Sequence, residues 1–349
     1  MDFNVHDPNG VLIGIVESPT SAIWTRRYYK PNDFELYFPA TAEALAMMVD
    51  DCYITRDDRP EVMIVEHVEI ITNEEEGDYI LISGRGCESI LARRIVLHQT
   101  RLSGRVDAAI HRLVEENAVA PSDPERALPI LMPTPNVLAA SIAAQYTGKN
   151  LLETVEEICK AYGIGFRAVV DNYSVVTPII ELLIGTDRSA GQTINSPVIF
   201  SPEYENLLSS NYVLDTSNYK NVAIVAGEGE GTARKRAIYG SASGMHRREL
   251  YVDARDMSTN EGEISEADYT AQMLARGAEQ LAEHSITESF DGEIDTANTY
   301  ILDEDYTVGD IVTVINAYGI LKDVRITAIM ESWDATGYAA VPVYENVEV

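Results

Sequence analysis

The six histidines are the first residues in this sequence that could catalyse a reaction or bind a metal, because general bases and zinc sites commonly use imidazole. They lie at positions 6, 67, 98, 111, 246 and 284, and no two of them have the spacing of metal ligands. The motifs HExxH, GxSxG and GxxxxGK(S/T) are absent from the sequence. His67 lies in an expected strand and is better interpreted as a packed or surface residue. We therefore predict no catalytic residue, no metal ligand, no cofactor site and no enzymatic activity.

The segment Gly227-Glu228-Gly229-Glu230-Gly231 could be mistaken for a phosphate-binding loop. Such loops direct backbone N–H groups at an anion, usually with a helix N-terminus behind them and a lysine beside them. Here two glutamates would repel a phosphate, and the residues that follow begin no obvious helix. The pattern instead predicts a flexible hairpin loop.

The segment from Asp303 to Asp310 contains four carboxylates and could be mistaken for a calcium loop. An EF-hand needs alternating oxygen ligands, glycine at position six and glutamate at position twelve, and this segment does not have that order. We predict a polar turn that leads into a strand at residues 311–315, with calcium binding as the alternative.

Basic residues are scarce but gather in two groups. The first consists of Arg85, Arg93, Arg94, Arg101, Arg105 and Arg112, and the second of Arg234, Lys235, Arg236, Arg247 and Arg248. Two interpretations stay open: salt bridges within the chain, or contacts with acidic faces of neighbouring subunits, where arginine is favoured. The excess of 19 tyrosines over 6 phenylalanines fits half-buried surfaces that face other proteins.

The overall charge restricts the possible partners. The 349 residues contain 26 Lys and Arg against 56 Asp and Glu, so the net charge is 26 − 56 = −30. This charge opposes binding to nucleic acids and to anionic membranes, and it favours solubility. The length predicts two or three domains.

The cysteines and the apolar segments indicate the compartment. Cys52, Cys87 and Cys159 lie far apart and form no CxxC pair, so we predict reduced, buried thiols. Residues 1–10 contain no apolar signal region, and the most apolar stretch, 175–184, is interrupted by Pro178 and Glu181. We expect a protein that is made and used in solution, without membrane contact.

The first hundred residues have a β pattern. Phe34, Leu36 and Phe38 alternate along residues 33–38 and should share one face of a strand. Residues 62–71 and 79–83 should form a hairpin with a solvated acidic turn at 73–77. One short helix is expected at 41–49, with Thr41 as its N-cap.

The middle of the chain has a mixed pattern. Val106, Ile110, Leu113 and Val114 recur at helical spacing, and a proline-rich connection then leads to an expected helix near 137–146. The clearest helix runs from the N-cap Asn150 to Gly163. Its apolar stripe consists of Leu151, Leu152, Val155, Ile158, Cys159 and Tyr162. Strands are expected at 166–170 and 174–184.

The last part returns to a β pattern. Strands are expected at 198–200, 212–214, 221–226, 237–239, 299–302, 310–315, 324–329 and 338–343, and a helix capped by Ser265 at 265–284. We predict an α+β, mainly β fold: a discontinuous first β-barrel-like domain (1–101 plus 198–255), an inserted α/β domain (102–197), and a helix plus a second β-barrel-like domain (256–349).

Several stretches resemble one family of proteins in their order and spacing. These stretches are residues 24–29 (WTRRYY), 33–39 (DFELYFP), 84–95 (GRGCESILARRI), 185–189 (GTDRS), 219–223 (YKNVA), 247–249 (RRE) and 305–310 (DYTVGD). Together they are similar to the siphophage tail-tip or baseplate hub proteins, including the N-terminal hub part of tail-associated lysins. The resemblance extends through nearly the whole chain.

The resemblance implies a bacteriophage or prophage structural protein of the virion tail, assembled in the cytoplasm of the bacterial host. It implies a homotrimeric ring in which two β-barrel-like domains per chain give a pseudo-sixfold hub. Its partners would be the tail tube or distal tail proteins and the tip or fibre proteins, with DNA passing through the lumen without specific binding. Carboxylates lining that lumen would prevent DNA from adhering.

Two other classes of function stay open. The chain could be a cell-wall-degrading tail enzyme, a peptidoglycan hydrolase that uses Glu156 with Glu157 or Asp303 with Asp305. Glycoside cleavage needs two carboxylates that face each other across a cleft, which neighbours in sequence do not establish. The chain could also be a carbohydrate-binding module for host attachment, although Trp24 and Trp333 are its only tryptophans.

Overall fold

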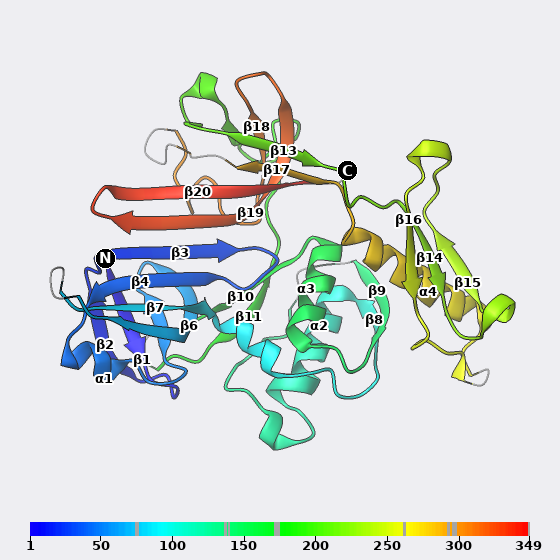
Figure 1. Ribbon diagram of the computed structural model, residues 1–349, viewed down its shortest axis with the longest axis horizontal. Helices are drawn as coiled ribbons and strands as arrows, with labels where there is room; N and C mark the ends of the chain where they lie inside the picture. The colour runs from blue at the N-terminus through cyan, green and yellow to red at the C-terminus, as the bar shows by residue number, and fades with distance from the viewer. Residues whose placement is uncertain are drawn as a thin grey trace.

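Strands dominate the structure of the chain. A computed structural model describes residues 1–73, 77–135, 138, 140–170, 175–260, 263–291, 294 and 299–347, which form a mainly β fold with four α-helices among those residues (Figure 1). Eleven strands follow one another across the main sheet in the order β13-β17-β20-β19-β3-β4-β7-β6-β5-β1-β2. The mainly β class predicted from the sequence is confirmed.

The N-terminal part contains seven strands and one helix. They are β1 (Asp2–His6), β2 (Leu12–Glu17), β3 (Ser21–Arg27), β4 (Asp33–Pro39), α1 (Ala42–Met47), β5 (Tyr53–Arg56), β6 (Arg59–Ile71) and β7 (Tyr79–Gly86). Phe34, Leu36 and Phe38 of β4 are buried around Trp24, as their alternation predicts. Thr41 caps α1 by accepting a hydrogen bond from the N–H of Ala44. The predicted hairpin is β6 paired with β7; residues 74–76 of its turn lie outside the described residues.

The middle part packs two helices and short strands around a second core. It contains a 3₁₀ helix (Cys87–Arg93), β8 (Thr100–Arg105), α2 (Val106–Val114), a π-helical turn (Glu115–Val119), β9 (Ser141–Tyr146), α3 (Leu151–Tyr162), β10 (Gly165–Val169) and β11 (Ile179–Leu183). Asn150 caps α3 by accepting from the N–H groups of Leu152 and Glu153, and Gly163 ends it with a positive φ of 66°. Both ends of this helix are confirmed.

The helix predicted near 137–146 is wrong for residues 141–146. They form β9, which pairs with β8 along its whole length, and Ile142 and Tyr146 are buried. The alanines of this segment favour a helix locally, but pairing with β8 outweighs that propensity. Residues 137 and 139 lie outside the described residues.

The C-terminal part contains β12 (Ile199–Phe200), β13 (Asn211–Asp215), β17 (Thr287–Asp291), β18 (Ile311–Ile315), β19 (Leu321–Asp334) and β20 (Gly337–Asn346). The strand predicted at 299–302 is wrong: those residues make one isolated bridge, from Leu302 to Tyr306. The backbone instead turns, because the Asp305 carboxylate accepts the N–H of Ile301 and the N–H of Asp305 donates to the Ile301 carbonyl.

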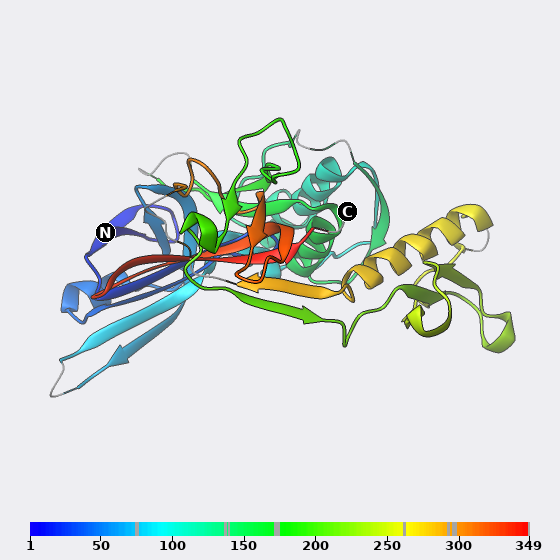
Figure 2. The same cartoon turned by 90° about the horizontal axis from the view of Figure 1, so that it is seen from above.

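A peripheral lobe projects from one end of the molecule (Figures 1 and 2). It contains β14 (Val222–Ala226), β15 (Arg236–Tyr239), β16 (Glu249–Asp253) and α4 (Glu266–Ala282). Ser265 caps α4 as predicted, accepting from the N–H of Asp268. Gly277 lets this helix approach the sheet closely, because a Cβ there would lie 2.9 Å from the Val225 side chain. Short 3₁₀ turns occupy Pro124–Arg126, Pro202–Tyr204, Gly231–Ala233 and Gly244–His246.

The two ends of the chain meet in the middle of the main sheet. β3 pairs antiparallel with β19, so that Trp24 lies opposite Glu331. Figure 1 shows β19 and β20 beside β3 and β4. Of the strands in 198–255, β12 pairs with β18 and β13 with β17, whereas β14, β15 and β16 pair with one another. The division into three domains stays a prediction.

Candidate functional site: a charge network between β3 and β19

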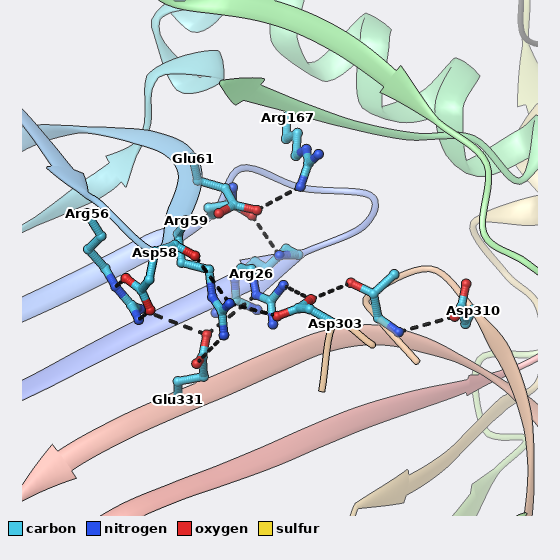
Figure 3. A network of polar contacts seen from close by, with 12 residues as sticks. Arg26, Arg56, Asp58, Arg59, Glu61, Arg167, Asp303, Asp310 and Glu331 are labelled. Atoms are coloured by element: carbon cyan, nitrogen blue, oxygen red, sulfur yellow. Dashed lines mark hydrogen bonds and ion pairs between the residues drawn. The ribbon is translucent and has the colours of Figure 1, made fainter. Parts of the chain in front are cut away.

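Buried charged side chains gather where β3 meets β19 (Figure 3). Arg26 of β3 and Glu331 of β19 are 3% and 1% exposed, a degree of burial that charged residues rarely have unless they are paired. Both point away from solvent because they follow the same alternation as their buried neighbours Trp24 and Ile329. Strand periodicity therefore places these charges between the two parts of the sheet.

The carboxylates of Asp303 and Glu331 each bind both Arg26 and Arg59. Asp303 lies 2.6 Å from Nη1 of Arg26 and 3.0 Å from Nη1 of Arg59. Glu331 lies 3.0 Å from Nη2 of Arg59 and 3.5 Å from Nε of Arg26, and it accepts the Tyr338 hydroxyl at 3.2 Å. These ion pairs connect β3 to three other segments: the turn at Asp303, β6 and β19.

Arg56 forms the aromatic side of the network. Its guanidinium carbon lies 4.6 Å from the ring centroid of Trp333 and 5.3 Å from that of Trp24. Asp58 binds its other edge through Nε and Nη2, at 3.0 and 2.7 Å. Arginine suits this place because its planar, weakly hydrated cation can stack on rings while it donates in its own plane.

The network reaches the middle part of the chain through β10. Nη1 of Arg167 donates to Glu61 at 2.8 Å, and its Nε donates to Glu181 at 2.7 Å. A second extension holds the turn before β18, where Asp310 accepts Arg188 at 3.0 Å and the N–H of Thr186 at 2.7 Å. Charged contacts thus join all three parts of the chain.

The pKa shifts follow from these pairings. Burial alone would lower the pKa of Arg26, but Asp303, Glu61 and Glu331 outweigh it and raise that pKa above its ordinary value. Burial would raise the pKa of Asp303, but Arg26 and Arg59 keep it below its usual range. Both groups are therefore charged at neutral pH, and the contacts among them are ionic.

One further buried carboxylate, Glu88, is held by backbone N–H groups and not by an arginine. Glu88 is fully buried and accepts the N–H of Asn32 at 2.8 Å and the N–H of Ala168 at 2.9 Å. Burial raises its pKa to about 7, partly offset by these hydrogen bonds. Glu88 links the turn between β3 and β4 to β10.

The sequence-predicted candidates have structural roles. The segment 227–231 lies in the β14–β15 hairpin, and a Cβ at Gly227 would lie 2.2 Å from the Tyr269 hydroxyl. The polar turn at 303–310 leads into β18 as predicted, and its Asp303 and Asp310 bind arginines. Of the carboxylate pairs, Glu157 binds Lys149, and Asp305 accepts a backbone N–H. His67 is a surface residue.

The basic groups are largely paired within the chain. Arg85 binds Glu66 and Arg93 binds Asp51, and in the second group Arg234 binds Asp253 and Arg247 binds Glu249. The three cysteines are free and buried, as predicted. Among the described residues, no group of three or more His, Cys, Asp or Glu could hold a metal, and no helix could span a membrane.

Sequence reasoning missed the network itself. The available signal was the position of Arg26 two residues after Trp24, which puts a charge on the core face of β3. Asp303 was recognised as an acidic residue of a turn, but its partner Arg26 lies 277 positions away in the sequence. No local pattern identifies a contact of that range.

Comparisons with known proteins agree with this architecture. The family model described as Siphovirus ReqiPepy6 Gp37-like protein matches residues 2–343. A prophage MuSo2 43 kDa tail protein from Shewanella oneidensis superposes with a TM-score of 0.58 at 13% identity, covering 99% of this chain and 98% of that one. Prophage tail protein gp18 from Listeria monocytogenes EGD-e gives 0.56 at 14% identity, and a tail protein from Neisseria meningitidis MC58 gives 0.55 at 12%. Each covers 99% of this chain and 95% of the other. A search of curated protein sequences found no match.

Proposed function

The chain belongs to the family of Siphovirus ReqiPepy6 Gp37-like proteins, and we propose that it is the hub subunit at the distal end of a siphophage tail. Membership of a tail protein family confirms the resemblance found in the sequence and makes the chain a structural component of the tail. The observation that carries the hub proposal is the match over 99% of this chain to tail proteins that are themselves covered almost completely.

In this proposal three copies form a ring of approximate sixfold symmetry. Two separate apolar cores lie on either side of the β3–β19 pair, one around Trp24 and one around Phe200. We take them as the cores of two barrel-like domains, so that three chains supply six. The charge network would fix the angle between the two cores. A change of angle would separate its ion pairs and leave several buried charges without partners, which is energetically costly.

The ring would join the tail tube to the tip proteins and let DNA pass. The face of β3 and β4 opposite the Trp24 core is hollowed over about 620 Å³ and includes Arg27, Asp33 and Glu35. We place this face toward the bore. A trimer would carry about 3 × 30 = 90 negative charges before titration and counterions, which would keep DNA from adhering. A neutral or basic bore in the electrostatic potential of a solved trimer would contradict this part of the proposal.

The ring is tested by mass and by imaging. Light scattering over a range of concentrations should show a species of 3 × 38.5 = 115.5 kDa, and negative-stain images of that species should show rings. A monomer at every concentration would contradict self-assembly of the isolated chain. Its assembly in the host cytoplasm and its contacts with tube and tip proteins belong to the same proposal.

Zymography on peptidoglycan separates the hub from the lytic alternative. We expect no cleared zone, because Asp303 binds two arginines and Glu157 binds Lys149. Clearing that disappears in a Glu157→Gln variant would favour a hydrolase instead.

A further inference from the structure

Two unlike surfaces lie at opposite ends of the molecule. The β6–β7 hairpin lies at one end of the longest axis and the peripheral lobe at the other, and both views agree on this (Figures 1 and 2). We call residues 66–73 and 77–79 of that hairpin the arm. We call the side of the β15-β14-β16 sheet that faces away from α4 the lobe face.

The lobe face carries an apolar row that is largely exposed in the described part of the chain. Ile224, Ile238 and Tyr251 lie side by side across the three strands. Ile238 is 57% exposed and Tyr251 58%, although each lies in a regular strand. α4 packs on the other side, since Gly277 approaches Val225 there.

The charge of the lobe sheet is opposite to that of the chain. Residues 219–255 contain 7 Lys and Arg and 4 Asp and Glu, a net charge of 7 − 4 = +3 in a chain of −30. Arg234 lies over the Tyr251 ring at 5.9 Å and also binds Asp253. Arg236 precedes Ile238 on the same side of β15 and has no carboxylate partner among residues that the structure describes.

The arm has matching properties. Its apolar side continues outward from the core, because Val68 lies opposite Ile82 and Ile70 opposite Ile80. Ile80 and Ile82 are buried, but Val68 is 41% and Ile70 53% exposed. The described residues of the arm contain three carboxylates, Glu66, Glu69 and Asp78, and no lysine or arginine. Beyond residue 66, β6 pairs only with β7 within the described part of the chain.

We propose that the arm of one copy packs on the lobe face of the next copy in the ring. Val68 and Ile70 would cover Ile238 and Tyr251, and the arm's carboxylates would lie near Arg236. A contact between different surfaces of identical chains is heterologous and closes into a ring when its rotation permits. This inference rests on the proposed function, because the molecule that binds the lobe face is a second copy of the chain. It adds which surface each copy uses.

Cross-linking tests the contact directly. A Val68→Cys, Ile238→Cys double variant should give covalent dimers and trimers with a bifunctional maleimide, whereas each single variant should give none. The native cysteines do not interfere, because all three are fully buried. The matched control pairs Val68→Cys with Ile194→Cys, a residue 90% exposed on a loop, and should give no product.

The outcomes separate this inference from the proposed function. If light scattering shows an oligomer but the double cysteine variant gives no cross-linked product, the arm contact is overturned and the proposed ring is retained. Dimers from a single variant also overturn the contact, because they indicate like surfaces meeting. A wild-type monomer at every concentration overturns both the arm contact and the self-assembly of the isolated chain.

A charge variant adds a second readout. Arg236→Glu should raise the concentration at half assembly about tenfold, with a smaller effect in high salt, because the arm is acidic. Arg101→Glu makes the same charge change on an exposed residue outside the lobe and should leave assembly nearly unchanged. Equal effects of the two variants would overturn the proposed contact.

Discussion

Replacing Glu331 with glutamine tests how strongly the charge network holds the two parts of the sheet together. The substitution keeps the shape of the side chain but removes a buried charge that lies within 3.0 to 3.9 Å of Arg59, Arg26 and Arg56. Asp303, Asp58 and Glu61 would then remain near the three guanidinium groups, and Glu61 also binds Arg167. Leaving buried charges uncompensated costs about 3–5 kcal/mol, a factor of roughly 10² to 10⁴ in the unfolding equilibrium.

The two tryptophans make this loss measurable. Trp24 and Trp333 are the only tryptophans and both lie against Arg56, so their fluorescence reports on the junction itself. Urea titrations followed at tryptophan emission should show the unfolding free energy of Glu331→Gln lowered by about 3–5 kcal/mol.

A matched control uses an exposed ion pair. Glu345 lies 3.1 Å from Lys160 with both side chains well exposed, and Glu345→Gln should cost less than about 1 kcal/mol. If Glu331→Gln is no more destabilising than Glu345→Gln, the network does not hold the junction and the reasoning is refuted.

Two further substitutions test other contacts. The Glu88 pKa of about 7 lies above its unfolded value of 4.5, so its stabilising contribution is complete below about pH 4.5 and is lost as the pH rises through 7. Urea midpoints at pH 5 and pH 8 should therefore differ less in Glu88→Gln than in the wild type, and an unchanged difference would rule out Glu88 as the titrating group. Gly309→Ala would force a Cβ to within 2.3 Å of the Tyr28 ring at a φ of +97°, whereas Gly319→Ala has a similar φ of +76° and open space. Thermal unfolding should show the first variant less stable than the second by about 1–3 kcal/mol, and equal stability would show that the ring contact is unimportant.

Local signals in the sequence predicted the elements that depend on local physics. The strand at 33–39 and the helix from Asn150 to Gly163 were recognisable because alternation, an N-cap and a C-terminal glycine are written in neighbouring residues. The errors at 141–146 and 299–302 have two different causes. In the first, pairing with the distant strand β8 sets the conformation. In the second, the Asp305 carboxylate accepts the N–H of Ile301 and turns the backbone, a local contact that the alternation of side chains does not reveal.

Local signals of this kind could not predict the charge network. The sequence supplied its charged residues but not their burial, which depends on β3 meeting β19. The partial exception is the segment 303–310, whose position before a strand was predicted and whose carboxylates bind Arg26, Arg59 and Arg188.

The pairing of β3 with β19 also imposes a delay during synthesis. The last residue of β3 and the first of β19 are 321 − 27 = 294 positions apart, so the ribosome needs about 15 to 60 seconds to make the second after the first. Until β19 is made, the edge of β3 that will pair with it stays open, and Arg26 and, once it is made, Arg56 lack Glu331. Translational speed therefore determines how long the early strands can mispair or recruit a chaperone before their native neighbour emerges.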